Sequence, residues 1–299
     1  MRIGWNVLTD GRTLGEIVAE IRQAADAGLH SVWFGQLLSW DAVTLAALAG
    51  QQVPGIELGT AITQTYPRHP IALAGQALTA QAAVGGRFTL GIGPSHPPII
   101  EGVFGHSYDR PARHTREYLS ALVPLLRGEQ VEYRGETITA AGAVTVPGAT
   151  PPQVLVSALG PVMLRVAGEL SDGTVTTWIT ARSLGEHVVP EITRAAEKAG
   201  RPAPRVVAAA VAALTPDPGA VRRDIAARYS AASDLPAYRA TLDRQGLTGV
   251  EQTVLAGDER ALEQAIRDYA DAGATDLVLS PWGDRTRLLA FLSELAARA

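Results

Sequence analysis

Short apolar runs of strand length alternate with stretches of helix length along this chain, and no other feature restricts the fold as strongly. We predict eight strands, at residues 2–7, 31–35, 56–62, 87–92, 153–157, 172–178, 205–214 and 276–280. Such alternation over about 250 residues is typical of an α/β chain that closes into a (β/α)8 TIM barrel. A doubly wound open sheet is the alternative, but no Gly-x-Gly-x-x-Gly motif follows the first strand.

The alternation is interrupted twice within what we predict to be a single domain over residues 1–299. Residues 97–152 are predicted to form an insertion, with a helix and a hairpin pattern around Arg134-Gly135. Residues 220–249 belong to a long helical region that breaks near Pro236, and we predict that they form a lid. We expect both segments to wall the pocket of the barrel.

Composition excludes several classes of function. The net charge of −4 and the lack of a basic run argue against nucleic acid as a partner. The chain has no cysteine, which excludes disulfides, thiolate nucleophiles and thiolate metal sites. The N-terminus lacks the apolar core of a signal peptide, and no uncharged apolar stretch of about 18 residues is present. We therefore expect a cytoplasmic protein without a membrane span.

Functional residues of a barrel gather at the carboxyl ends of its strands, and here these ends carry few acids. Paired carboxylates, as in a glycosidase, are absent from them, and so is a Gly-x-Ser-x-Gly nucleophile motif. His69 and His96 lack an obvious third metal ligand, so we predict no metal site. The remaining amides, hydroxyls and imidazoles suit a bound organic cofactor that supplies the chemistry. The polar residues at these ends include Gln36, Thr63, Gln64, Arg68, His69, His96 and Ser157.

The corner Ser157-Ala158-Leu159-Gly160-Pro161 joins a strand to a helix. Backbone N–H groups at a helix start bind anions, and Gly160 has no side chain to keep a phosphate away from the backbone. Ser157 adds a hydroxyl donor. The corner is therefore a candidate phosphate site, although Gly-Pro sequences also form ordinary turns between strands and helices.

Three further side chains have two interpretations each. His96 follows a buried strand and is either a hydrogen-bond or proton donor at the pocket or an inert loop histidine. Arg68 can bind a phosphate or carboxylate, but a surface salt bridge is its commoner role. Gln36 either bonds to a ring edge or ends its strand. Trp40 is a candidate for stacking near a cofactor.

Taken together, four segments give the chain a recognisable likeness. They are residues 31–36 (SVWFGQ), 58–70 (LGTAITQTYPRHP), 85–93 (GGRFTLGIG) and 256–258 (AGD). With them the chain resembles the luciferase-like flavin and deazaflavin oxidoreductases, and specifically the branch that uses the 5-deazaflavin coenzyme F420. The likeness extends from Ile3 to the last predicted helix.

The resemblance implies a barrel with the deazaflavin ring at its carboxyl face. It implies a bulge with a non-prolyl cis peptide that backs the ring, which falls at Ala61-Ile62. It also matches residues 158–161 to the phosphate-binding loop of the family. By the same likeness, Gln36, Thr63 and Gln64 fall where family members contact the ring or the ribityl chain.

Two positions depart from part of the family. His96 replaces a catalytic Glu of some sugar-phosphate dehydrogenases, and Gln36-Leu37 replaces an Asp-His pair, so that chemistry is disfavoured. We predict a hydride transfer between F420 and a small organic substrate, with His96 as the proton donor, in an enzyme expected to form a homodimer. The alternatives are an FMN-dependent monooxygenase of the same fold and a barrel that binds the deazaflavin without catalysis.

Overall fold

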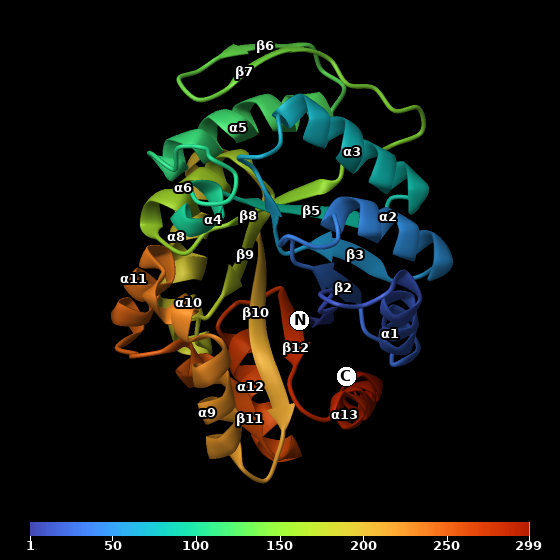
Figure 1. Ribbon diagram of the computed structural model, residues 1–299, viewed down its shortest axis with the longest axis vertical. Coiled ribbons are helices and arrows are strands. Elements are labelled where there is room, and N and C mark those ends of the chain that lie inside the picture. Colours follow the sequence, from blue (N-terminus) through green and yellow to red (C-terminus); the bar gives the residue numbers. More distant parts are fainter. Residues whose placement is uncertain (299) are drawn as a thin grey trace.

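Eight parallel strands close into a barrel in the computed structural model, which describes residues 1–298 (Figure 1). The strands pair in chain order, and β10 pairs with both β9 and β12 to complete the ring. The predicted (β/α)8 barrel is therefore confirmed. Its strands are β1 (Arg2–Asn6), β2 (Ser31–Phe34), β3 (Glu57–Thr60), β5 (Phe88–Gly93), β8 (Gln153–Ser157), β9 (Gly173–Thr177), β10 (Arg205–Leu214) and β12 (Asp276–Pro281).

Helices surround this barrel, and local sequence signals explain where several of them begin. Thr13 and Glu16 form a capping box at the start of α1, and Asp258 caps α12. Proline occupies the first turn of α3, α5 and α6. A backbone N–H in the first turn has no partner within the helix, so proline costs no hydrogen bond there. The main outer helices are α1 (Leu14–Asp26), α2 (Ala42–Gln52), α3 (Pro70–Ala83), α5 (Pro111–Leu126), α6 (Pro161–Leu170), α8 (Val189–Lys198), α12 (Glu259–Asp271) and α13 (Arg285–Arg298).

The third strand, predicted over residues 56–62, ends two residues earlier than predicted. β3 ends at Thr60, and a separate pair of residues, β4 (Thr63–Gln64), resumes pairing with β5. Thr60 Oγ1 donates to Gly91 O over 2.7 Å and accepts from Gly91 N over 2.9 Å. A Cβ at Gly91 would collide with the carbonyl oxygen of Thr60, so glycine permits this close approach. The peptide bond between Ala61 and Ile62 is cis, as predicted.

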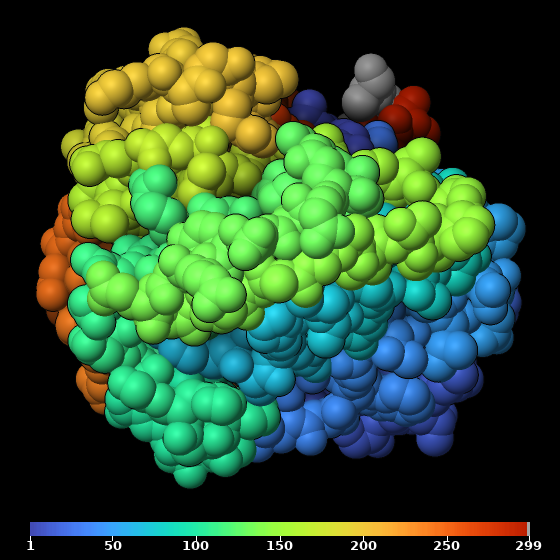
Figure 2. Space-filling view, turned by 90° about the horizontal axis from the view of Figure 1, so that it is seen from above, coloured from blue at the N-terminus to red at the C-terminus, as the bar shows by residue number. Residues whose placement is uncertain are grey.

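The insertion at 97–152 contains α4 (Pro97–Ile100), α5 and a hairpin of β6 (Val131–Arg134) and β7 (Thr139–Gly142). The Glu117 carboxylate on α5 holds the hairpin turn by accepting from the backbone N–H groups of Glu136, Thr137 and Ile138. Figure 2 shows the chain around the hairpin as a green to yellow-green band across the outer surface. The hairpin therefore lies on the outer surface of the molecule.

Between β10 and α12, the chain forms four short helical elements and one strand. The sequence did not predict the strand. The short elements are α9 (Pro218–Arg228), α10 (Ser230–Asp234), α11 (Pro236–Gln245) and the 3-10 helix Val250–Thr253. The unpredicted strand is β11 (Leu255–Gly257), which pairs with the outer end of β10. Its three residues are too few for an alternating pattern to reveal it. Before this region, α7 (Ala181–Ser183) and a π-helix (Leu184–Val188) lead into α8.

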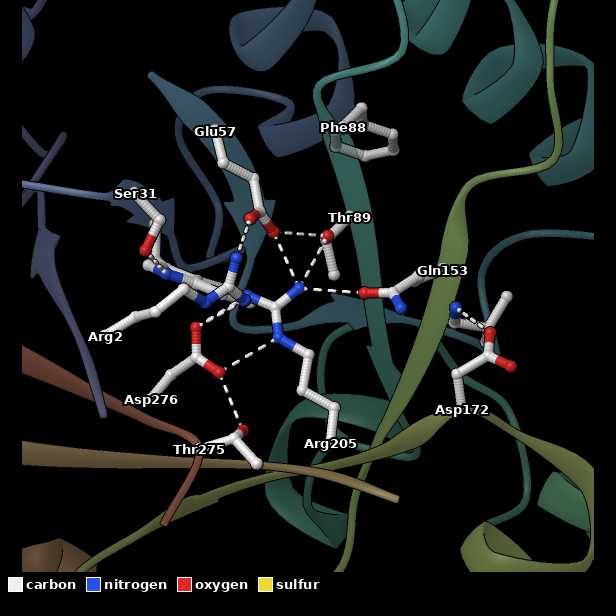
Figure 3. Close-up of polar contacts among 12 residues, drawn as sticks. Arg2, Ser31, Glu57, Phe88, Thr89, Gln153, Asp172, Arg205, Thr275 and Asp276 are labelled. Carbon is white, nitrogen blue, oxygen red and sulfur yellow. Dashed lines mark hydrogen bonds and ion pairs between the residues drawn. The ribbon is translucent and has the colours of Figure 1, made fainter. Parts of the chain in front are cut away.

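A network of charged side chains closes the amino end of the barrel (Figure 3). Arg205 donates through Nη1 to Glu57 Oε1 and through Nη2 to Asp276 Oδ1, both over 2.7 Å. Arg2 pairs with the same two carboxylates, and Gln153 Oε1 accepts from Arg205 over 3.0 Å. Each of these five residues is the first of its strand. The network therefore links the amino ends of five barrel strands.

No helix in the part of the chain that the structure describes is both long and apolar enough to cross a membrane.

Candidate functional site

A cavity of about 400 Å³ lies at the carboxyl ends of the barrel strands. Its walls come from the loops after β2, β5 and β8, from the bulge after β3, from the start of the insertion, and from α11. This is the position that barrel enzymes use for their chemistry. Of the residues predicted for the site, it is lined by Gln36, Ala61, Ile62, Gln64, His96, Ser157, Leu159 and Gly160.

Four predicted residues do not line this cavity. Thr63 and Ala158 are buried beside it, and Pro161 begins α6 behind the corner. Arg68 lies elsewhere, because its Nη2 pairs with Asp41 Oδ2 over 2.6 Å. The ion-pair interpretation of Arg68 is therefore the one that the structure shows.

Unpartnered polar atoms cluster at the bulge. Thr63 Oγ1 and Gln64 Oε1 are buried and have no hydrogen-bond partner among the described residues. Gln64 lines the cavity with only 3% of its surface exposed. Leaving a buried polar group unpaired costs about 1–3 kcal/mol, so such atoms indicate a place where a ligand completes the bonding.

Gln36 is already partly engaged by the protein. Its Oε1 accepts from Ala42 N over 2.8 Å, and its backbone N donates to Ile62 O over 3.1 Å. Gln36 therefore ties the start of α2 to the bulge, while its side chain still lines the cavity. Trp40 does not line the cavity, since its Nε1 donates to Arg12 O over 3.0 Å.

His96 faces the cavity from the loop after β5. Its Nδ1 is buried without a partner, and its ring packs edge-on against Tyr238 with 4.6 Å between centroids. Burial lowers the pKa of His96 below its usual range, so the imidazole is neutral at pH 7. A neutral imidazole with a free nitrogen can donate a hydrogen bond to a ligand oxygen or accept one from a ligand donor.

Aromatic side chains support the wall beside His96. Tyr108 donates from its hydroxyl to Ser95 O over 2.6 Å, which holds the loop that carries His96. Tyr66 stacks between Tyr108 and His114, with centroid distances of 5.5 and 3.8 Å. Burial lowers the pKa of His114 to about 4 and raises the pKa of Tyr66 to about 12, so both groups are uncharged near neutral pH.

Another part of the cavity wall is the corner after β8. Gly160 precedes α6, whose first N–H groups have no side-chain cap. A Cβ built on Gly160 would meet no atom within 4 Å, so the backbone there faces open space. Uncapped N–H groups and the positive end of the helix dipole can hold an anion at this point.

Sequence reasoning missed the cavity residues Tyr108, Met163, Tyr238, Thr241 and Arg244. Tyr238, Thr241 and Arg244 all come from α11, within the segment predicted as a lid. Their spacing of three residues along a helix was the available signal, because it places them on one face. Within residues 1–298, no three His, Asp or Glu side chains are grouped to hold a metal ion.

Comparisons with known proteins agree with this geometry. A family model described as luciferase-like monooxygenase matches residues 1–276. The chain is 28% identical over 246 residues to a 5,10-methylenetetrahydromethanopterin reductase of Methanolobus tindarius, covering 80% of this chain and 75% of that protein.

Two solved structures share the fold at low sequence identity. The first is an F420-dependent secondary alcohol dehydrogenase in complex with an F420-acetone adduct, at 17% identity and a TM-score of 0.84, covering 100% of this chain and 99% of that one. The second is the oxygenating constituent of 3,6-diketocamphane monooxygenase of Pseudomonas putida in complex with FMN. It is 17% identical with a TM-score of 0.77, covering 99% and 96% of the two chains.

Proposed function

The chain belongs to the luciferase-like monooxygenase family and is an enzyme, and from this premise we propose that it transfers a hydride between coenzyme F420 and a small organic substrate. The observation that carries the proposal is the set of unpartnered buried atoms around the bulge, namely Thr63 Oγ1, Gln64 Oε1 and His96 Nδ1. Gln64 and His96 line a cavity whose wall also includes Gly160, at the uncapped start of α6. A planar, polar ring with a phosphate on its side chain matches both features.

The residues of the cavity fit such a cofactor. Gln36 and Gln64 would bond to the ring edge, and the backbone at Gly160 would hold the phosphate. Ile62 lies where it would support the ring face. When bound, a reduced deazaflavin supplies a hydride. The protein contributes orientation and a cavity wall rich in apolar groups.

His96 would act on the substrate. Its neutral imidazole lies at the cavity wall with one nitrogen unpartnered, so it can hydrogen-bond to a substrate oxygen and pass a proton to it. The side chains around it, including Ile99, Tyr108 and Tyr238, carry no formal charge at neutral pH. Burying an unpaired charge there would be unfavourable, so we expect a neutral substrate such as a ketone, an enone or a secondary alcohol.

Titration of the purified protein with F420 and with FMN tests the cofactor. We expect saturable binding of F420, seen as a change in its fluorescence, and tighter binding of F420 than of FMN. Oxidation of the bound reduced coenzyme by a panel of neutral carbonyl compounds then tests the reaction. Failure of F420 to bind would end the proposal.

An FMN-dependent monooxygenase is the second candidate. The FMN complex that shares this fold favours it, because the same corner after β8 suits either phosphate. A yellow protein as purified, together with oxygen consumption in the presence of reduced FMN, would support it. The third alternative, binding of the deazaflavin without catalysis, gains no support from membership of a family of enzymes.

A further inference from the structure

One charged side chain reaches the main cavity. Among the described residues that line it, only Arg244 carries a formal charge at neutral pH. It comes from α11 and lies 85 residues along the chain from Leu159, to whose carbonyl oxygen its Nη1 donates over 3.3 Å. This contact brings the guanidinium to the corner that starts α6. A cation and an uncapped helix start thus meet at one end of the cavity.

The charge of Arg244 is not neutralised by the protein. No carboxylate within residues 1–298 lies within 4.0 Å of its guanidinium. The nearby acids that share a smaller neighbouring cavity with it are already engaged, since Glu186 pairs with Arg182 and Glu191 pairs with Arg194. Arg244 therefore retains donors for a ligand, and a guanidinium binds phosphate oxygens with paired hydrogen bonds.

The backbone around Arg244 is held firmly against the barrel. Gln245 accepts from Thr180 N over 2.8 Å and donates to Trp178 O over 3.0 Å. Leu242, on the other side, is fully buried in a small apolar cluster. The end of α11 that carries Arg244 is therefore anchored on both sides of this residue, while the Arg244 side chain itself is exposed at the rim of the cavity.

We propose that Arg244 makes the cavity select phosphorylated over unphosphorylated flavin-type ligands. It is a positioning residue: it holds the anionic end of the cofactor against the start of α6 and so sets the depth of the ring beside His96. This inference rests on the proposed function, because it takes the cofactor to lie in this cavity. It adds a residue from the lid segment to a site that the loop after β8 would otherwise form alone.

Two matched ligand pairs test the proposal. They are FMN with riboflavin, which differ only in the phosphate, and F420 with its ring-ribityl fragment, which lacks the phosphate and the acidic tail beyond it. Binding of each is measured by fluorescence titration at several salt concentrations, for the unaltered protein and for R244Q, R244K and R222Q. Arg222 is exposed on α9 and outside the cavity, so R222Q removes the same charge as a control. Thermal melting of each variant shows that it is folded.

We expect R244Q to weaken binding of the phosphorylated ligands by about 10- to 100-fold, as for loss of a charge-assisted hydrogen bond, and of the unphosphorylated ones by less than about twofold. R244K should keep part of the preference, and R222Q should keep all of it. The salt dependence of phosphorylated-ligand binding should also flatten in R244Q. Equal weakening within each pair would mean a purely structural role, and no weakening would mean no role; either result overturns the proposal.

The test separates this inference from the proposed function. If FMN binds in an Arg244-dependent way and F420 does not bind, the proposed function fails while the role of Arg244 stands. If F420 binds, and R244Q prefers phosphorylated ligands as strongly as the unaltered protein does, the role of Arg244 fails while the proposed function stands. If neither phosphorylated ligand binds, both are overturned.

Discussion

The two ends of the barrel differ in whether their polar side-chain atoms have hydrogen-bond partners within the protein. At the amino end, Arg205 bonds to Glu57, Asp276 and Gln153, and Arg2 pairs with the same two carboxylates (Figure 3). At the carboxyl end, atoms of equal polarity lie buried beside a cavity without a partner. Every unpartnered buried side-chain atom found in residues 1–298 lies between positions 63 and 96. At one end the protein pairs its own polar groups, whereas at the other it leaves buried polar atoms without a protein partner.

Removing the central cation of the amino end should have the largest effect. In Arg205→Met, the carboxylate of Asp276, which is fully buried, loses its main partner. Burial alone would raise the pKa of Asp276, but its hydrogen bonds and ion pair with Arg205 hold that pKa below its usual range. Breaking a buried pair costs about 3–5 kcal/mol, so we expect a loss of this size in the free energy of urea-induced unfolding.

A surface pair supplies the control for this measurement. Arg201 contacts Asp172 over 3.1 Å, but both side chains are partly exposed, so Arg201→Met should cost less than about 1 kcal/mol. If Arg205→Met cost no more than Arg201→Met, the amino end would not be the stabilising region that we describe. Arg205→Lys keeps the charge without the fork of donors and should fall between the two.

Acid should weaken the carboxyl end before it weakens the amino end. The pKa of His114 is about 4 in the folded protein because of burial, against 6.5 when exposed, so the unfolded chain binds the proton more readily. Stability is then lost as the pH falls from about 6.5 toward 4, by up to about 3 kcal/mol. At the amino end, hydrogen bonds and the ion pair with Arg205 hold the pKa of Asp276 below its usual range, so that carboxylate titrates below pH 4. Unfolding measured between pH 4 and 8 checks the prediction.

His114→Phe should reduce this dependence while keeping the stacking on Tyr66, and His96, whose pKa burial also lowers, should account for the remainder. The slope of unfolding free energy against pH should become flatter between pH 4 and 6.5 in this variant. An unchanged slope would assign the acid sensitivity to another group.

The parts of the fold that could be predicted are those set by residues close together in the sequence. The strands and most helices follow from the spacing of apolar residues and from caps such as Thr13 and Asp258. The corner before α6 was also visible, because glycine and proline mark a turn locally. The break after Thr60 was predicted only by resemblance, since nothing in the run itself interrupts the apolar pattern.

The contents of the cavity were less predictable, because they depend on contacts between distant segments. Tyr238 meets His96, and Arg244 meets Leu159, only once the barrel has closed. Local sequence also left two interpretations of Arg68 open. It follows the bulge, but Asp41 at the start of α2 pairs with it and keeps it out of the cavity.

Replacing the unpartnered imidazole tests the chemical role of the carboxyl end. His96→Phe preserves an aromatic ring against Tyr238 and removes both nitrogens. With the coenzyme and the best substrate of the panel, we expect kcat to fall by about 10²-fold, which is typical for loss of a proton donor. Affinity for the coenzyme should stay within about twofold. An unchanged kcat would show that another group serves the substrate oxygen.

The smallest expected effects come from replacing a glutamine by leucine once at each end of the barrel. Because the substitution is the same, the two variants compare the two ends directly. Gln64→Leu removes a buried oxygen that has no partner, so it should leave the protein as stable as before or more stable by about 1 kcal/mol. It should also weaken cofactor binding by about tenfold, since the ligand loses a hydrogen-bonding group. Gln153 is exposed, so Gln153→Leu removes one hydrogen-bond acceptor from Arg205 and should cost about 0.5–1.5 kcal/mol with binding unchanged. Urea unfolding and cofactor titration on both variants measure the two quantities. If both substitutions destabilised the protein equally, Gln64 would be a structural residue, and the distinction between the two ends would not hold.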